Sequence, residues 1–304
     1  MTVFAIVAPG QGAQKSGFLT PWLELPAFAE TLESFSAAAG IDLAAYGTEA
    51  DDETIRDTAI AQPLLVAAAL ASAHALGEQA DVYAGHSVGE LAAAALAGVF
   101  GVDDAARLVT VRGRAMAAAS AARPTSMTAV VGGDTGEVLA AIQAHGLTPA
   151  NNNGKGQIVA AGTVEELAAF AADPPRRARL FPLSVAGAFH TVHMKPAVSE
   201  LQQAAQQVVA CETDTRLLSN RDGALVTGAD ALERLVGQVA HPVRWDLCMD
   251  TLAELGVTGL LELTPAGTLT GIAKRNLPGV ELFNLNTPDQ LDDARAFAAA
   301  HRNR

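Results

Sequence analysis

The sequence predicts an α/β protein made of a large domain with a mostly parallel sheet and a small ferredoxin-like domain inserted into it. Short apolar runs typical of strands alternate with helical patterns in both halves of the chain, which favours parallel strands covered by helices on both faces. Between them, residues 126–183 follow the βαββαβ order of a ferredoxin-like unit. We therefore expect residues 1–124 and 185–304 to form the large domain and residues 125–184 the small one.

The first 124 residues supply the start of the large domain. Val3 to Val7 is a short apolar run that stops at the loop Pro9-Gly10-Gln11-Gly12, as expected of a strand. The Ala-rich stretch after Ala61-Gln62-Pro63 is too long for a strand and is expected to be helical. In chain order we expect a strand at 3–7, a helix at 61–76, a strand at 82–85, and helices at 88–98 and 103–119.

The insert and the last third of the chain continue the alternation. In the insert, the turn Asn153-Gly154-Lys155-Gly156 separates two strand-like runs. The insert is expected to hold strands at 127–133, 147–153, 157–162 and 177–184, with helices at 137–146 and 163–174. The remainder is expected to hold helices at 194–209, 229–239 and 245–255, with strands at 215–220, 258–263 and 280–286.

Length and charge limit the partners. A chain of 304 residues is long enough for a large domain and a small one. It carries 20 basic and 33 acidic residues, a net charge of −13, which disfavours nucleic acid because phosphate binding needs a basic face. An acidic partner would need a local basic patch, although such residues are more often solvated surface charges. The candidates are Arg176, Arg177, Arg179, Lys195, Lys274 and Arg275.

Signals of cellular location favour the cytoplasm. No run of about 18 apolar residues lacks charges or turn signals, so no membrane span is expected. The apolar N-terminus MTVFAIVAPGQGAQ lacks a basic leader and a usual cleavage site, which indicates a first strand rather than a signal peptide. Cys211 and Cys248 form no disulfide framework and no C-x-x-C pair, as is typical of a reduced protein.

The segment VYAGHSVGE, residues 82–90, places a serine where a strand turns into a helix. Its GHSVG matches G-x-S-x-G, the nucleophile elbow of α/β-hydrolase-like domains. Gly85 and Gly89 leave room for the tight turn that pushes the Ser87 hydroxyl outward, and the helix after it aims its N–H groups at the site. The pattern alone is also compatible with a purely structural strand–helix turn.

A serine nucleophile needs a base. His86 is adjacent but unsuitable, because neighbouring side chains on such a turn diverge, and we expect it to be structural. His190 follows a glycine-containing loop and precedes a helix, which suits a side chain that reaches across a cleft, and His193 lies three residues further on. The remaining histidines are expected to be structural or solvated: His74, His145 and His301.

Six motifs occur in one order along the chain: APGQGAQ, AQP, GHSVGE, VRGRAM, NNNGKGQIVAAG and GAFHTVHM. Together they resemble the malonyl-CoA:acyl-carrier-protein transacylase family, over essentially the whole chain. The resemblance implies transfer of a malonyl group from coenzyme A to the phosphopantetheine thiol of acyl carrier protein, through a malonyl-serine ester, for fatty acid or polyketide synthesis. It also implies a monomer that needs no cofactor beyond its thioester substrates.

The resemblance implies roles for the residues in these motifs. Ser87 would be the nucleophile and His190 the general base and acid. The backbone N–H groups of Gln11 and Val88 would form the oxyanion hole. Arg112 would bind the free malonyl carboxylate, since a guanidinium matches a carboxylate in a bidentate way.

Further positions concern the substrate cleft. Gln62 and Asn153 resemble polar cleft residues of the family. Val88 and Phe189 resemble malonyl-selective members, and a bulky Phe189 would crowd an α-methyl branch. A misfit of one methyl group is typically worth about 1–3 kcal/mol, so a preference rather than absolute exclusion is expected.

The third member of the catalytic group is unusual for a serine enzyme. Hydrolases of this type orient their histidine with Asp or Glu, whereas the family uses a backbone carbonyl, which falls here on Gln238. The chain departs from the family at His241, where Asn is common before Pro-Val, and at Thr264-Pro265-Ala266-Gly267, where Gly-Pro-Gly is common. The first departure could alter the loop around His190.

Two rival functions remain open on the sequence. A serine thioesterase would form the same ester and pass it to water, but Arg112 disfavours an apolar acyl pocket because a buried arginine there would lack a partner. A non-catalytic scaffold protein would be expected to have damaged motifs. No metal site is expected, since no Cys, Asp or Glu stands at ligand spacing beside His190 and His193.

Overall fold

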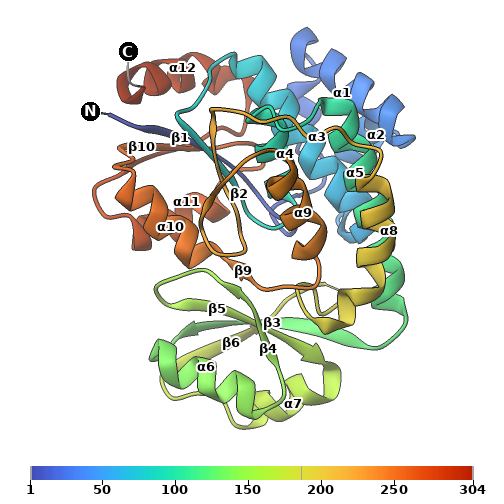
Figure 1. Ribbon diagram of the computed structural model, residues 1–304, viewed down its shortest axis with the longest axis vertical. Coiled ribbons are helices and arrows are strands. Elements are labelled where there is room, and N and C mark those ends of the chain that lie inside the picture. Colours follow the sequence, from blue (N-terminus) through green and yellow to red (C-terminus); the bar gives the residue numbers. More distant parts are fainter. Residues whose placement is uncertain (1, 186, 303–304) are drawn as a thin grey trace.

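The computed structural model describes residues 2–185 and 187–302 as an α/β protein with two sheets (Figure 1). The predicted domain ranges also include residues 1, 186, 303 and 304, which lie outside the described residues. In Figure 1 the larger sheet and most helices form the upper body, and the smaller sheet lies below it. The predicted fold class is confirmed, with a mostly parallel sheet in the larger body and a ferredoxin-like strand order in the smaller one.

Six strands form the larger sheet, in the order β11-β10-β1-β2-β7-β8. The first five strands in this order run parallel to one another, and β8 pairs with β7 in the antiparallel sense. All of β1 is buried, as expected of a parallel strand covered on both faces. The bounds are β1 Phe4–Ala8, β2 Val82–Gly85, β7 Arg216–Leu218, β8 Leu225–Val226, β10 Gly259–Glu262 and β11 Glu281–Asn284.

Helices cover both faces of this sheet. Because side chains alternate along a strand, Phe4, Ile6 and Ala8 of β1 pack into the core beneath α1, α3, α4 and α5. Ala5 and Val7 pack into a second core with α10 and α11. The helices of this body are α1 Pro26–Ala39, α2 Leu43–Thr48, α3 Thr58–Leu76, α4 Gly89–Leu96, α5 Val102–Ala121, α8 Lys195–Ala205, α9 Gly228–Gln238, α10 Trp245–Glu254, α11 Thr268–Asn276 and α12 Leu291–His301. Single 3-10 turns lie at Thr20–Trp22, Thr54–Arg56, Val192–Met194 and Pro288–Gln290.

α3 is the central helix of the larger body. Within the described ranges it is the one helix long and apolar enough to cross a membrane by length and composition, and 83% of that window is buried inside the protein. A helix that is apolar on all sides and enclosed by other elements is typical of a protein core. It begins at Thr58, where the Asp57 side chain accepts from the Ala59 N–H, and not at the expected residue 61.

The smaller sheet has the order β6-β3-β5-β4-β9. β3 (Thr125–Gly132), β4 (Thr148–Asn152), β5 (Gln157–Thr163) and β6 (Ala178–Pro182) pair in the antiparallel sense. α6 (Thr135–Ala144) and α7 (Val164–Ala172) lie on the face turned away from the larger body (Figure 1). β9 (Val243–Arg244) adds a parallel edge strand to β4, although it lies far outside the predicted range 125–184.

Several elements differ from the sequence predictions. The helix expected at 194–209 ends at Ala205, and α1, α2, α11 and α12 were not predicted. α1 does carry ordinary signals, since it begins with Pro26 and ends at Gly40 in a left-handed conformation. β8 and β9 have two residues each, which is too short for any period to be visible in the sequence.

Candidate active site

Ser87 occupies a tight turn between β2 and α4. Its φ of 54° lies in the left-handed region, which a non-glycine residue adopts only where the surroundings enforce it. A Cβ on Gly85 would collide with the Gly89 carbonyl, and a Cβ on Gly89 would collide with the carbonyl oxygens of Ala8 and Pro9. Both glycines of the motif are therefore required by the close approach of backbone segments.

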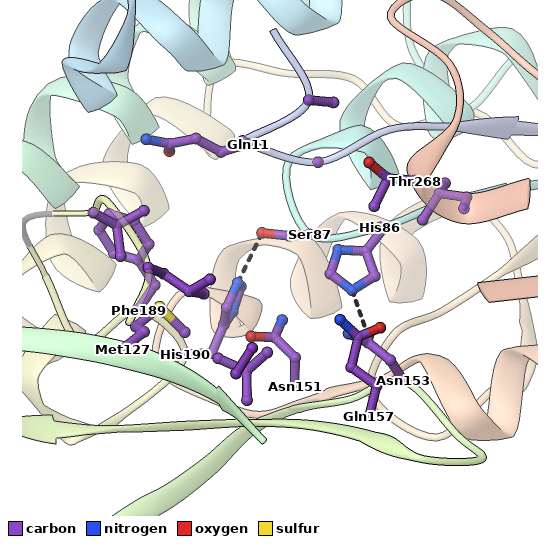
Figure 2. Close-up of a pocket in the computed structure, with 18 of the residues that line it drawn as sticks. Gln11, His86, Ser87, Met127, Asn151, Asn153, Gln157, Phe189, His190 and Thr268 are labelled. Carbon is purple, nitrogen blue, oxygen red and sulfur yellow. Dashed lines mark hydrogen bonds between the residues drawn. The ribbon is translucent and has the colours of Figure 1, made fainter. Parts of the chain in front are cut away.

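Ser87 and His190 meet at one side of the cleft (Figure 2). The Ser87 Oγ lies 2.7 Å from His190 Nε2, and His190 Nδ1 lies 2.9 Å from the carbonyl oxygen of Gln238. A carbonyl can only accept, so Nδ1 carries the proton and Nε2 is left free to accept the serine proton. The predicted pair is thus brought together, and the group that orients His190 is a neutral carbonyl.

The backbone also fixes His190. Its φ is 62°, and its N–H donates to the Val239 carbonyl at 3.0 Å, so the loop before α8 is bound to the end of α9. The side chain is 2% exposed. Burial, with the positive charge of Arg112 as the second cause, lowers the pKa of His190 to about 3. The imidazole is therefore neutral near pH 7, which is the form that accepts a proton.

The proposed oxyanion donors lie at the ends of two elements. Gln11 follows β1, and Val88 stands at the N-terminal end of α4, where helix N–H groups have no partner within the helix. Within residues 2–185 and 187–302, neither backbone N–H donates to a protein acceptor. The Gln11 side chain turns away, and its Nε2 donates to Arg56 O and Thr58 Oγ1 at 3.3 Å.

Arg112 is buried in the middle of α5, with 2% of its surface exposed. Its guanidinium donates to Gln62 Oε1 at 2.7 Å and to Gln238 Oε1 at 2.8 Å. Burial lowers its pKa to about 10, which still leaves the group charged near neutrality. Gln62 lines the cleft and Arg112 does not, so the amide of Gln62 stands between the cation and the cleft.

The cleft itself has a volume of about 230 Å³ and lies between the two sheets. Ser87 and His190 face it from the larger body, and Asn151, Asn153 and Gln157 face it from β4, β5 and the turn between them (Figure 2). Phe189 and Met127 give it an apolar side. The predicted cleft residues Gln62, Asn153 and Phe189 all line it, whereas Asn151, Gln157 and Thr268 were not predicted.

His86 is occupied by structural contacts. Its Nε2 lies 2.9 Å from Asn153 Oδ1, and its ring packs edge-on against Trp245. Burial lowers its pKa, so it is neutral in the folded protein. The other histidines set aside in the sequence contact residues away from the cleft: His74 bonds Thr31, His145 bonds the Ala141 carbonyl, and His301 bonds Thr258.

Asn220 and Glu90 support the turn and were not singled out in the sequence. Asn220 Oδ1 accepts from the Ser87 N–H at 2.8 Å, and Asn220 Nδ2 donates to the Gly85 carbonyl at 2.7 Å. Glu90 accepts from the Asn220 N–H at 3.1 Å. A signal for Asn220 was present, because it follows β7, the strand beside β2, and the carboxyl ends of adjacent parallel strands meet at one edge.

The unusual His241 leaves the His190 contact in place. Its ring Nδ1 lies 2.7 Å from the Gly237 carbonyl, and its side chain is exposed. Its backbone N–H donates to the same Gln238 carbonyl that holds His190, at 3.2 Å.

As for metal ions, the described ranges contain no group of three or more His, Cys, Asp or Glu side chains placed to bind one.

Comparison with known proteins gives the class. The family model described as an acyl transferase domain matches residues 5–277, which is most of the chain. The chain therefore belongs to the acyl transferase family, as its motifs predicted.

More specific relatives are transacylases. The malonyl CoA-acyl carrier protein transacylase of Mycobacterium bovis is 49% identical over 298 residues, covering 96% of this chain and 99% of the relative. That of Escherichia coli (strain K12) is 34% identical over 303 residues, covering 96% of this chain and 98% of the relative. These matches extend over nearly the full length.

Solved structures agree in fold. The crystal structure of MCAT from Mycobacterium tuberculosis matches with a TM-score of 0.92 and 49% identity, over 96% of this chain and 99% of that one. A malonyl-transacylase in complex with a type II PKS acyl-carrier protein matches with a TM-score of 0.90 and 31% identity, over 97% of this chain and 99% of that one.

Replacement of Asn220 tests the support of the turn. Asn220→Ala leaves the Ser87 N–H and the Gly85 carbonyl without their partners, and each such loss costs about 1–3 kcal/mol. We expect a lower free energy of unfolding in urea and at least ~10-fold slower acylation, since small displacements of a nucleophile are costly. Asn152→Ala is the control, because its amide bonds Asp246 and the Gly154 N–H and contacts neither Ser87 nor Gly85. Acylation unchanged from the wild type would contradict this role.

The lowered pKa of His190 predicts the acidic side of the pH–rate profile. A histidine whose pKa is lowered keeps its base form as pH falls and loses it only below its own pKa. At saturating malonyl-CoA, we expect the acyl-enzyme formation rate to change less than about twofold between pH 8 and pH 6. Rapid-quench mass spectrometry measures this rate. A rate that falls to half near pH 6.5, the ordinary pKa of a histidine, would show that His190 is not held neutral.

Proposed function

We propose that this protein transfers the malonyl group from malonyl-CoA to the phosphopantetheine thiol of an acyl carrier protein. The observation that supports this most directly is the chain of contacts from Ser87 to His190 and from His190 to the Gln238 carbonyl. The buried Arg112 lies beside this chain. The relatives named as malonyl CoA-acyl carrier protein transacylases carry the same function in their names and match almost the whole chain.

In the first half-reaction, His190 Nε2 takes the Ser87 proton while the Ser87 Oγ attacks the thioester carbonyl carbon. The N–H groups of Gln11 and Val88 stabilise the negative oxygen of the tetrahedral intermediate. The C–S bond then breaks, His190 returns the proton to the coenzyme A sulfur, and a malonyl-serine ester remains. In the second half-reaction the carrier thiol gives its proton to His190 and attacks the ester, and Ser87 regains the proton.

A neutral carbonyl on His190 suits this chemistry. The Gln238 carbonyl fixes the tautomer as an aspartate would, but it stabilises the imidazolium less than a carboxylate does. A thiol is a good leaving group, so little help from a strong acid is needed. The ester is formed and broken by thiols of similar reactivity, which makes a reversible transfer efficient.

Arg112 selects the acyl group. A malonyl carboxylate would take the place of Gln62 Oε1 on the guanidinium, so Gln62 must turn aside when the substrate enters. Phe189 would crowd a branch next to the thioester, and Asn153, which is held by His86, would bound the polar side of the cleft. The alternative, a serine hydrolase, is disfavoured because hydrolases of this type orient their histidine with Asp or Glu, whereas His190 is held by the neutral Gln238 carbonyl.

The wider setting follows from the same proposal. We assign residues 1–124 and 185–304 to the catalytic domain and 125–184 to the small domain. β9 belongs to the catalytic domain in sequence but pairs with β4 in the sheet of the small domain. A monomer in the cytoplasm with no cofactor beyond its thioester substrates fits a chemistry that uses only serine and histidine. Cys211 and Cys248 are both free, which suits a reducing compartment.

Intact-protein mass spectrometry tests the transfer. We expect incubation with malonyl-CoA to add one malonyl group to the protein, and later addition of carrier protein to move that group to the carrier. Ser87→Ala should form no adduct. Rapid loss of the adduct to water would favour the hydrolase, no adduct on the wild type would favour a scaffold, and an adduct on Ser87→Ala would refute the nucleophile.

Replacement of Arg112 tests acyl selection. Loss of one partner of a buried ion pair typically costs about 3–5 kcal/mol, so Arg112→Ala should lower kcat/KM for malonyl-CoA by roughly 10²- to 5 × 10³-fold. Acetyl transfer should fall far less, so the ratio shifts toward uncharged acyl groups. Arg114→Ala is the matched control, since Arg114 lies two positions along α5 and is exposed. An unchanged malonyl preference in Arg112→Ala would remove Arg112 from the site.

A further inference from the structure

Glu90 is a buried acid that the mechanism above does not use. It lies in the first turn of α4, three residues after Ser87, and is 2% exposed. One carboxylate oxygen accepts from the Asn220 N–H at 3.1 Å, and the other accepts from Gln238 Nε2. Both oxygens therefore face donors, which is the arrangement that suits the ionised form.

The Gln238 side chain connects this acid to Arg112. Its Oε1 accepts from Arg112, while its Nε2 faces the Ser87 carbonyl, Glu90 and Asn220 Oδ1. Arginine can only donate and these three oxygens can all accept, so the orientation of the amide is determined by its neighbours. One amide thus separates a buried cation from a buried anion, and the backbone carbonyl of the same residue holds His190.

The charges around Glu90 are few. Arg112 faces it from α5, and Cys248 faces it from α10 with a thiol whose pKa is raised by burial, so that it stays neutral. Glu90 and Gln238 also line a second cavity of about 230 Å³, which gives the acid a route to solvent. The charged or titratable groups on that cavity are Arg221, Glu233, Arg234 and His241, of which Arg234 is paired with Asp222 and Asp230.

We propose that Glu90 is the resident counter-ion of Arg112, and that the malonyl carboxylate replaces it in this role, so that binding of the malonyl thioester is coupled to protonation of Glu90. The argument rests on the proposed function, because it needs a carboxylate to reach Arg112. A buried cluster with one cation and two anions is costly, and the cost is relieved when the anion that can reach solvent takes up a proton.

The direction of the pH dependence follows. Burial already raises the pKa of Glu90 to about 7 in the free protein, and a second anion on Arg112 raises it further. Below the free pKa the acid is already neutral, so binding takes up no proton and affinity is highest. Above it, affinity for malonyl-CoA falls as pH rises, by at most about tenfold per pH unit, until the pKa of the bound state is passed.

Calorimetry on Ser87→Ala, which binds thioesters without forming the ester, tests this coupling. Titrations near pH 7.5 in two buffers of different ionisation enthalpy measure the protons taken up on binding. We expect malonyl-CoA to take up a substantial fraction of one proton more than acetyl-CoA, which has the same phosphates but no carboxylate. The excess should vanish in Ser87→Ala/Glu90→Gln, and the affinity for malonyl-CoA should then lose its pH dependence.

Glu262→Gln in the same background is the matched control. Glu262 is fully buried like Glu90, but it accepts from the N-terminus of α11 and not from Gln238. The excess uptake should persist in that variant. Equal uptake with both thioesters, or an excess retained in Glu90→Gln, would overturn the proposal, while absence of a malonyl adduct on the wild type would instead refute the proposed function.

A second measurement needs no change at position 90 and applies even where Glu90→Gln does not fold. In ¹³C-labelled Ser87→Ala protein, one buried glutamate carboxyl should titrate near neutrality. Its midpoint should rise when malonyl-CoA is added and stay unchanged when acetyl-CoA is added. A midpoint that is the same with both thioesters would overturn the coupling.

Discussion

The contact of Gly85 with Gly89 is the constraint on which the rest of the site depends. The end of β2 and the start of α4 approach so closely that no side chain fits between them, and Ser87 spans the turn between them in a left-handed conformation. Such a conformation costs on the order of 1–3 kcal/mol for a non-glycine residue and persists only when its surroundings hold it. Here the Asn220 side chain bonds both the Gly85 carbonyl and the Ser87 N–H, and it supplies that support.

Gln238 links the parts of the site that the turn alone leaves separate. Its backbone carbonyl orients His190, and its side chain joins Arg112, Glu90 and the Ser87 carbonyl. The residue whose carbonyl holds His190 therefore also contacts Arg112, to which we assign selection of the acyl group. A change in what Arg112 binds therefore has a direct physical route to His190 through Gln238.

Much of this was accessible from the sequence, and the reasons differ between residues. Ser87 could be named because its strand-to-helix turn has a recognisable local chemistry, and His190 because it follows a glycine-containing loop. Arg112 could be named only because the ordered set of motifs resembles a known family. The βαββαβ order could be predicted because strands and helices of ordinary length have visible periods. Asn220 has only the weak signal of its place after β7, and Glu90 has none, because a single polar residue after a strand or in a helix is common. The contacts that join Asn220 to Ser87 and to Glu90 span 130 or more residues of the chain.

The sequence by itself determined the alternating strands and helices of ordinary length, the two glycines of the turn and the serine and histidine types that suit nucleophilic chemistry, since these depend on local sterics and on spacing along the chain. Only the tertiary structure decided that Arg112 lies behind Gln62, that β9 joins the smaller sheet, and that Glu90 and Arg112 share one amide. These arrangements depend on contacts between segments far apart in the chain. Such contacts are set by packing and by the hydrogen bonding of buried polar groups. Neither produces a repeating pattern of residues in the sequence.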